Sequence, residues 1–140
     1  MKCTIIGSFR KYWRDILKAY DVFERNGITV LSPSNSDIVN PRAKFVRLAT
    51  DRKSAPPAEI ELRVLIALKR SDFVYLVDPR GYVGRTTAYE IGHAYPKEIY
   101  SSRHVRHDYL RLWVTGTYSP QDLCNFLKSR QDSPRGHMSF

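Results

Sequence analysis

The 140-residue chain contains two kinds of hydrophobic pattern. Short runs rich in apolar and β-branched residues favour strands, and they occupy residues 2–8, 28–31, 73–77 and 98–102. Apolar residues at helical spacing favour helices, and they occupy residues 10–27, 58–72 and 119–130. Gly27 is expected to end the first of these helices, and Ser119 to cap the last. The pattern therefore predicts strands that alternate with helices.

Strands that are apolar throughout are buried on both faces, and the helices between them supply the cover. We therefore predict an α/β fold, a single flavodoxin-like or Rossmann-like doubly wound domain with a mainly parallel sheet. The length suits one domain, expected over residues 1–130. Residues 32–57 are expected to form a long connection, and residues 131–140 a flexible C-terminal tail.

The chain carries 23 Lys and Arg against 14 Asp and Glu, a formal net charge of +9, which favours a phosphorylated small molecule or a polyanion as partner. The basic residues are scattered, which weakens a simple nucleic-acid-binding interpretation. The two cysteines are far apart, no apolar run could span a membrane, and the N-terminus lacks a signal-peptide pattern. We expect a cytoplasmic protein without membrane contact. Because no His, Cys and Asp cluster has metal-ligand spacing, we also expect no metal and no cofactor.

Two glycine-bearing loops are expected at the carboxyl ends of the strands, where doubly wound sheets bind their ligands. The loop "GSFRKYW" follows the first strand, and "DPRGYVGRTT" follows the strand at 73–77. Each precedes a helix, whose first turn can bind an anion. Neither loop completes a known phosphate-binding motif, so Gly7, Gly81 and Gly84 can equally be glycines that tight turns require.

Glu90, within "GYVGRTTAYEIGHA", has two interpretations that do not exclude each other. In the first, "TAYE" is a capping box in which Thr87 caps a helix and Glu90 bonds back to the Thr87 backbone N–H. In the second, the Glu90 carboxylate attacks or stabilises an electron-poor carbon, such as the anomeric carbon of a sugar. The local sequence pattern is compatible with both the capping role and the catalytic role of Glu90.

Three segments together resemble the nucleoside 2-deoxyribosyltransferase superfamily, which includes nucleotide N-glycoside hydrolases. They are "TIIGSFR", the helix ending in "RSD" before an apolar strand, and "GYVGRTTAYEIGHA". The most specific feature is the spacing of Gly84, Glu90, Gly92 and Ala94. The resemblance implies that Glu90 attacks the anomeric carbon of a (deoxy)ribonucleoside or its 5′-monophosphate and displaces the base. The glycosyl group then passes to water or to another base.

The resemblance also implies a set of substrate-binding residues. The opening loop would contact the sugar or a 5′-phosphate, with an aromatic ring available to stack on the base, through Gly7, Ser8, Phe9, Arg10 and Tyr12. The second loop would add Gly81, Gly84, Thr86 and Thr87. A neighbouring subunit of a homodimer or higher homo-oligomer would complete the site with Ser101 and Ser102.

The chain departs from the family at two positions, because Val64 and Gly84 stand where aspartates are common. Acid help for the leaving base must then come from elsewhere, and the candidates are Glu61 and Asp78. Glu61 can instead be a solvated helix carboxylate, and Asp78 an ordinary turn residue before Pro79. Three functions stay open: an N-glycosidase or deoxyribosyltransferase, a non-catalytic nucleotide-binding sensor, and a basic nucleic-acid-binding protein.

Overall fold

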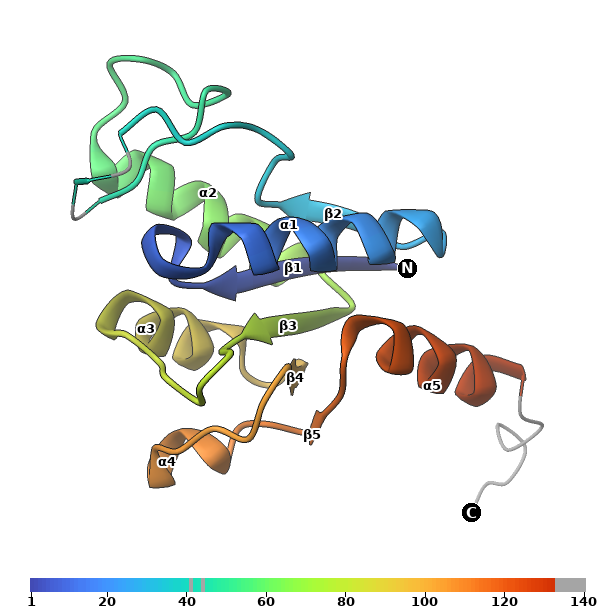
Figure 1. The fold of residues 1–140 in the computed structure, drawn as a ribbon. Helices are drawn as coiled ribbons and strands as arrows, with labels where there is room; N and C mark the ends of the chain where they lie inside the picture. Colours follow the sequence, from blue (N-terminus) through green and yellow to red (C-terminus); the bar gives the residue numbers. More distant parts are fainter. Residues whose placement is uncertain (41, 44, 133–140) are drawn as a thin grey trace.

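The computed structural model describes residues 1–40, 42–43 and 45–132. Strands and helices alternate over most of this length, as Figure 1 shows. The elements in chain order are β1 (Lys2–Gly7), α1 (Phe9–Arg25), β2 (Thr29–Ser32), α2 (Pro57–Arg70), β3 (Phe73–Val77), α3 (Arg85–Ala94), β4 (Glu98–Ser101), α4 (Asp108–Arg111), β5 (Gly116–Thr117) and α5 (Pro120–Asp132).

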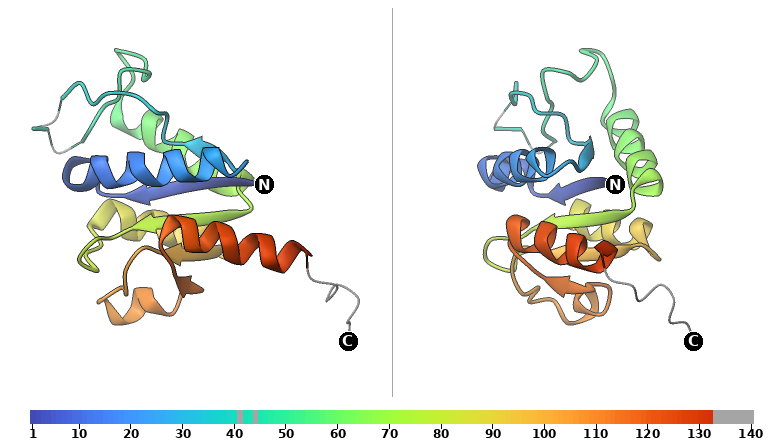
Figure 2. Two further views of the ribbon diagram at one scale, coloured as in Figure 1. Left: turned by 45° about the vertical axis from the view of Figure 1, so that its right-hand side comes forward. Right: turned by 90° about the vertical axis from the view of Figure 1, so that its right-hand side faces the viewer.

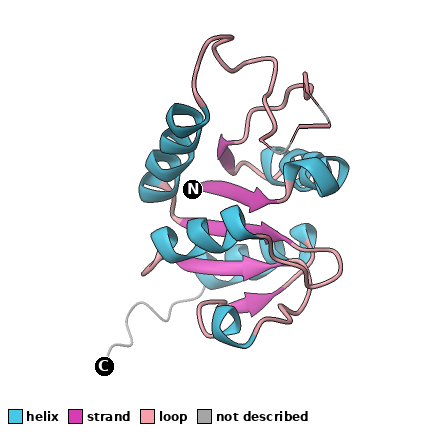
Figure 3. Ribbon diagram, turned by 90° about the vertical axis from the view of Figure 1, so that its left-hand side faces the viewer, coloured by secondary structure: helices cyan, strands magenta, loops and turns pink. Residues whose placement is uncertain are grey.

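The five strands form one sheet in the order β2-β1-β3-β4-β5, and every neighbouring pair is parallel. This is the flavodoxin-like strand order. Helices α1 and α5 contact each other on one face of the sheet, and α2 and α3 contact each other on the other face (Figure 2). Figure 3 shows the strands enclosed between these helices. The predicted doubly wound α/β fold is therefore confirmed.

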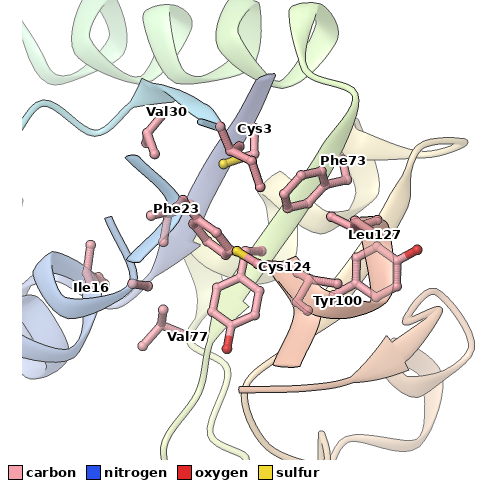
Figure 4. Close-up of a cluster of buried hydrophobic side chains, with 14 residues drawn as sticks. Cys3, Ile16, Phe23, Val30, Phe73, Val77, Tyr100, Cys124 and Leu127 are labelled. Atoms are coloured by element: carbon pink, nitrogen blue, oxygen red, sulfur yellow. The ribbon is translucent and has the colours of Figure 1, made fainter. Parts of the chain in front are cut away.

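The core is divided between the two faces of the sheet. All five residues of β3 are buried, because helices cover both of its faces. Alternate β3 side chains point to opposite sides, so Phe73 packs with Phe23 and Tyr100 beneath α1 and α5 (Figure 4). Val74 packs instead with Ile91 beneath α2 and α3. This two-sided burial explains why the strand is apolar throughout.

The helix ends follow local capping chemistry. The Ser8 hydroxyl accepts a hydrogen bond from the Lys11 backbone N–H, so α1 begins at Phe9, one residue before the predicted start. At the other end, Gly27 has a φ of 79°, which glycine tolerates without a steric cost. The Ser119 hydroxyl accepts a hydrogen bond from the Asp122 backbone N–H, and this predicted cap is confirmed.

Three features differ from the prediction. The short elements α4 and β5 were not expected. Helix α5 continues to Asp132, so residues 131 and 132 are helical and do not belong to a tail. The rest of the predicted tail, residues 133–140, lies outside the described residues.

The carboxyl ends of the strands define one edge of the molecule. In Figure 1 the arrows of β1 and β3 point to the left, towards the side where α1 and α3 begin. The long connection between β2 and α2 lies at the upper left of the same view. Within the described ranges, the structure contains no helix of the length and apolar character needed to cross a membrane.

Candidate functional site

A pocket of about 380 Å³ lies between the first turns of α2 and α3. Its volume falls within the range of about 300–1,000 Å³ that small-molecule sites occupy. The connection before α2 supplies one aromatic residue to its wall. The lining residues are Phe45, Pro57, Ala58, Glu61, Arg85, Thr86 and Tyr89. The sequence prediction included Glu61 and Thr86 as site residues.

The carboxyl groups of Glu61 and Glu90 lie close together, but only Glu61 belongs to the pocket lining. Glu61 lines the pocket from α2, whereas Glu90, on α3, is only 6% exposed. Burial raises the pKa of Glu90 well above the usual glutamate value, and the hydrogen bond and charge of Glu61 raise it further. The Oε2 atom of Glu61 is buried and has no hydrogen-bond partner among the described residues. This geometry favours a proton held between the two carboxyl groups.

The capping box predicted for Glu90 is wrong. Helix α3 begins at Arg85 with Gly84 as its N-cap, so Thr87 is the third residue of the helix and Glu90 the sixth. The Ala88 backbone N–H donates to the Gly84 carbonyl, which closes the first turn before Glu90 is reached. Because "GRTT" contains no helix-breaking residue after its glycine, the helix starts earlier than the capping pattern suggested. Glu90 therefore meets Glu61 and does not bond back to Thr87.

The electrostatic surroundings of the pocket suit an anion. Neither α2, which begins after Pro56, nor α3, which begins after Gly84, has a side-chain hydrogen bond at its N-cap. The N-terminus of α3 presents backbone N–H groups and the positive end of the helix dipole, whereas Pro56 and Pro57 at the start of α2 have no N–H to offer. Arg85 adds a cationic side chain to the pocket wall. The α3 side of the pocket is therefore suited to an anionic group, and Glu61 lines the pocket from α2.

Asp78 is fully buried at the end of β3 and does not belong to the pocket lining. Its Oδ1 atom accepts hydrogen bonds from the Ser102 hydroxyl and the Arg103 backbone N–H, both at 2.9 Å. Burial raises the pKa of Asp78 to about 6, although these hydrogen bonds act in the opposite direction. The bonds join the ends of β3 and β4, as the turn interpretation expects, whereas the Oδ2 atom of Asp78 is buried and has no hydrogen-bond partner among the described residues, so a catalytic role for Asp78 stays a prediction.

The two serines expected to face a neighbouring subunit are engaged within the chain. Ser101 is fully buried and its hydroxyl bonds with the Thr117 hydroxyl at 3.1 Å, so it cannot reach another subunit's site. The Ser102 hydroxyl donates to Asp78 and also accepts from the Asp78 backbone N–H. Thr87 is likewise buried and lies outside the pocket lining. These three side chains stabilise the fold around the site.

The opening loop is not part of this pocket. Ser8 caps α1, and Phe9 and Tyr12 pack against the core on the α1 face of the sheet. Arg10 is exposed on the first turn of α1. A Cβ atom on Gly7 would lie 2.7 Å from the Val77 carbonyl oxygen, so this glycine permits close approach of β1 and β3. The structure thus gives each of these residues a structural position.

The second loop contains one glycine with a clear steric role. Gly81 has a φ of 72°, and a Cβ atom there would lie 2.5 Å from the His104 carbonyl oxygen. Gly84 has an extended backbone and faces the Tyr82 ring, so its role is that of a helix N-cap. Neither glycine lines the pocket, whereas Thr86 does.

Sequence reasoning missed most of the pocket wall. Arg85 and Tyr89 lie four residues apart in the segment that contains Glu90, on the same helix face as the predicted Thr86, and this spacing was the available signal. Phe45, Pro57 and Ala58 come from the long connection and the start of α2, for which the sequence offered no signal. Within the described part of the chain, no group of three or more His, Cys, Asp or Glu residues could hold a metal ion.

Comparisons with protein-family models, curated proteins and solved structures found no match to this chain. The fold assignment therefore rests on the strand order and the helix positions. The chemistry assigned to the pocket rests on its own residues, and the resemblance to nucleoside 2-deoxyribosyltransferases stays a prediction.

Proposed function

We propose that the chain cleaves or exchanges the N-glycosidic bond of a (deoxy)ribonucleoside or its 5′-monophosphate at the Glu61–Glu90 pair. The observation that carries the proposal is the proximity of the buried Glu90 carboxyl group to Glu61, which lines a pocket of ligand size. Glycoside chemistry requires two such groups, one as nucleophile and one as proton donor. Glu61 thereby fills the acid role that Val64 and Gly84 cannot.

The raised pKa of Glu90 places the shared proton on Glu90 in the resting pair, so the proton first passes to Glu61 and leaves Glu90 ionised. In the first chemical step, the Glu90 carboxylate attacks the anomeric carbon, the bond from this carbon to the base nitrogen breaks, its electron pair leaves with the base, and Glu61 gives its proton to that base. An ester between Glu90 and the sugar results. In the second step, water or a second base attacks the same carbon and loses a proton to Glu61, while the ester bond breaks and its electron pair returns to the Glu90 carboxylate.

The position of the proton gives this mechanism its pH dependence. The reaction needs one proton on the pair, because a doubly ionised pair lacks the acid and a doubly protonated pair lacks the nucleophile. The raised pKa of Glu90 extends the singly protonated state to higher pH than two ordinary glutamates would permit. Activity is therefore expected to fall on both sides of an optimum.

The anionic end of the substrate is assigned to Arg85 and the N-terminus of α3. Arg10, the residue expected from the sequence to contact a 5′-phosphate, does not line the pocket, whereas Arg85 does. A charge-assisted hydrogen bond from Arg85 is worth about 1.5–3 kcal/mol. Arg85→Gln should therefore weaken 5′-monophosphate binding by about one to two orders of magnitude and leave nucleoside binding nearly unchanged. Equal losses for both ligands in calorimetry would remove Arg85 from this role.

The function is tested by chromatographic detection of free base from nucleosides and 5′-monophosphates. Glu90→Gln should lower turnover by about 10⁴-fold, and Glu61→Gln by about 10²- to 10⁴-fold. Glu59→Gln is the matched control, because Glu59 lies on the same helix and pairs with Arg52 and Arg63 outside the pocket. Base release by both pair variants at the wild-type rate, with melts showing folded protein, would refute the mechanism.

The burial of Glu90 favours a second candidate, a nucleotide-binding sensor. A buried, protonated carboxyl group cannot act as a nucleophile, but it can donate a hydrogen bond to a ligand. A sensor would bind a mononucleotide saturably and release no base from any substrate tested. Binding with base release selects the enzyme, and binding alone selects the sensor.

A further inference from the structure

The segment 103–113, which joins β4 to β5 through α4, exposes several cationic groups. Three arginines and one acidic residue give it a formal charge of +2, three minus one, with histidines neutral. The acidic residue, Asp108, pairs with Arg111, which also contacts the His104 ring. Within the described part of the chain, Arg103 and Arg106 take part in no ion pair. Both are exposed and available to an anionic partner.

Aromatic side chains are also exposed on this segment. Tyr109 is 75% exposed and Trp113 is 41% exposed. The Trp113 ring contacts the ring of Tyr95, itself 63% exposed, with centroids 4.9 Å apart and an edge-to-face arrangement. Edge-to-face contact leaves ring faces free to stack on a flat partner. Exposed rings on the same segment as unpaired arginines indicate a partner that offers both flat apolar faces and negative charge.

The segment is firmly attached to the sheet. Val105 is buried in the core on the α2 and α3 face. The Arg103 backbone N–H donates to Asp78, and the Arg106 backbone N–H donates to the Gly81 carbonyl. These contacts position the exposed side chains before any partner arrives, which lowers the ordering cost of binding. The attached loop adds the exposed Arg80.

We propose that the surface formed by residues 103–113 and Tyr95 binds single-stranded nucleic acid. Arginines neutralise phosphates, and aromatic rings stack on bases that a single strand leaves exposed but a duplex hides. The net charge of +9 is complementary to such a polyanion. The surface shares no residue with the pocket lining, so this binding is independent of the proposed glycosidic chemistry.

The test is a fluorescence anisotropy titration of a labelled single-stranded oligothymidylate at several salt concentrations. Arg103→Gln with Arg106→Gln removes two charges from the surface. The matched control, Lys69→Gln with Lys128→Gln, removes two charges from exposed positions near the C-terminal ends of α2 and α5. Tyr109→Ala tests stacking, with Phe126→Ala on α5 as a control ring outside both the surface and the pocket lining. Thermal melts establish that all variants are folded.

We expect saturable binding that weakens steeply with salt. The double arginine variant should reduce the slope of log affinity against log salt by about 1.4, about 0.7 for each lost phosphate contact. Tyr109→Ala should weaken binding by about 5- to 140-fold, the equivalent of about 1–3 kcal/mol of stacking. Both controls should have smaller effects. Equal losses in the two double variants, an unchanged affinity for Tyr109→Ala, or tighter binding of duplex DNA would overturn the proposal.

Discussion

The buried Asp78 should make the stability of the fold depend on pH in a defined direction. The pKa of Asp78 is about 6 in the folded chain, against a model-compound value of 3.8, because burial disfavours the charged carboxylate. The folded chain therefore binds more protons than the unfolded chain between these two values. Stability from this group is fully present below about pH 3.8 and is lost as the pH rises through about 6.

The magnitude follows from the two pKa values. Their difference corresponds to about 3 kcal/mol in the free energy of unfolding. About 2 kcal/mol of this change falls between pH 4.5 and pH 7.5, a range in which denaturation can be measured. Asp78→Asn removes the titration but keeps an oxygen that can accept from the Ser102 hydroxyl and the Arg103 N–H.

The assay is urea denaturation of both proteins at several pH values across this range. Subtracting the two unfolding free energies removes the effect of every other titrating group, Glu90 included, and of the net positive charge. The difference, wild type minus variant, should fall by about 2 kcal/mol from pH 4.5 to pH 7.5. A difference that is constant with pH, or that rises, would refute the assignment of a raised pKa to Asp78.

Three further substitutions or reactions test the fold. Gly81→Ala should destabilise the chain by about 1–3 kcal/mol, because its φ of 72° and the His104 carbonyl at 2.5 Å oppose a Cβ atom; an unchanged urea midpoint would contradict this. Tyr75→Phe should cost about 1 kcal/mol, because the Tyr75 hydroxyl donates to the Tyr118 carbonyl at 2.8 Å; a melt equal to wild type would contradict it. Both cysteine thiols are buried, and burial raises the pKa of each. A disulfide reagent should therefore label them rapidly only in denaturant. Rapid labelling of the native chain would contradict the burial of the two thiols.

The long elements of this protein were predictable from local pattern. The apolar run at 73–77 indicated a strand buried on both faces, and β3 is that strand. The helices at α1, α2 and α5 were recognisable because each repeats its apolar residues over several turns. In contrast, α4 has four residues and β5 has two, too few for any period to be visible. These short elements depend on tertiary contacts, such as the pairing of Gly116 with Tyr100.

The sequence by itself drew attention to Glu90 and named Glu61 as one candidate partner, but it could not bring them together. Their proximity depends on the packing of α2 against α3, because the two residues are far apart in the chain. The same packing buries Glu90 and raises its pKa, which no local pattern encodes. The local sequence pattern predicted the helices on which Glu61 and Glu90 lie. Only the tertiary structure decided which carboxyl groups meet and which of them lines the pocket, because long-range packing sets both distance and solvent access.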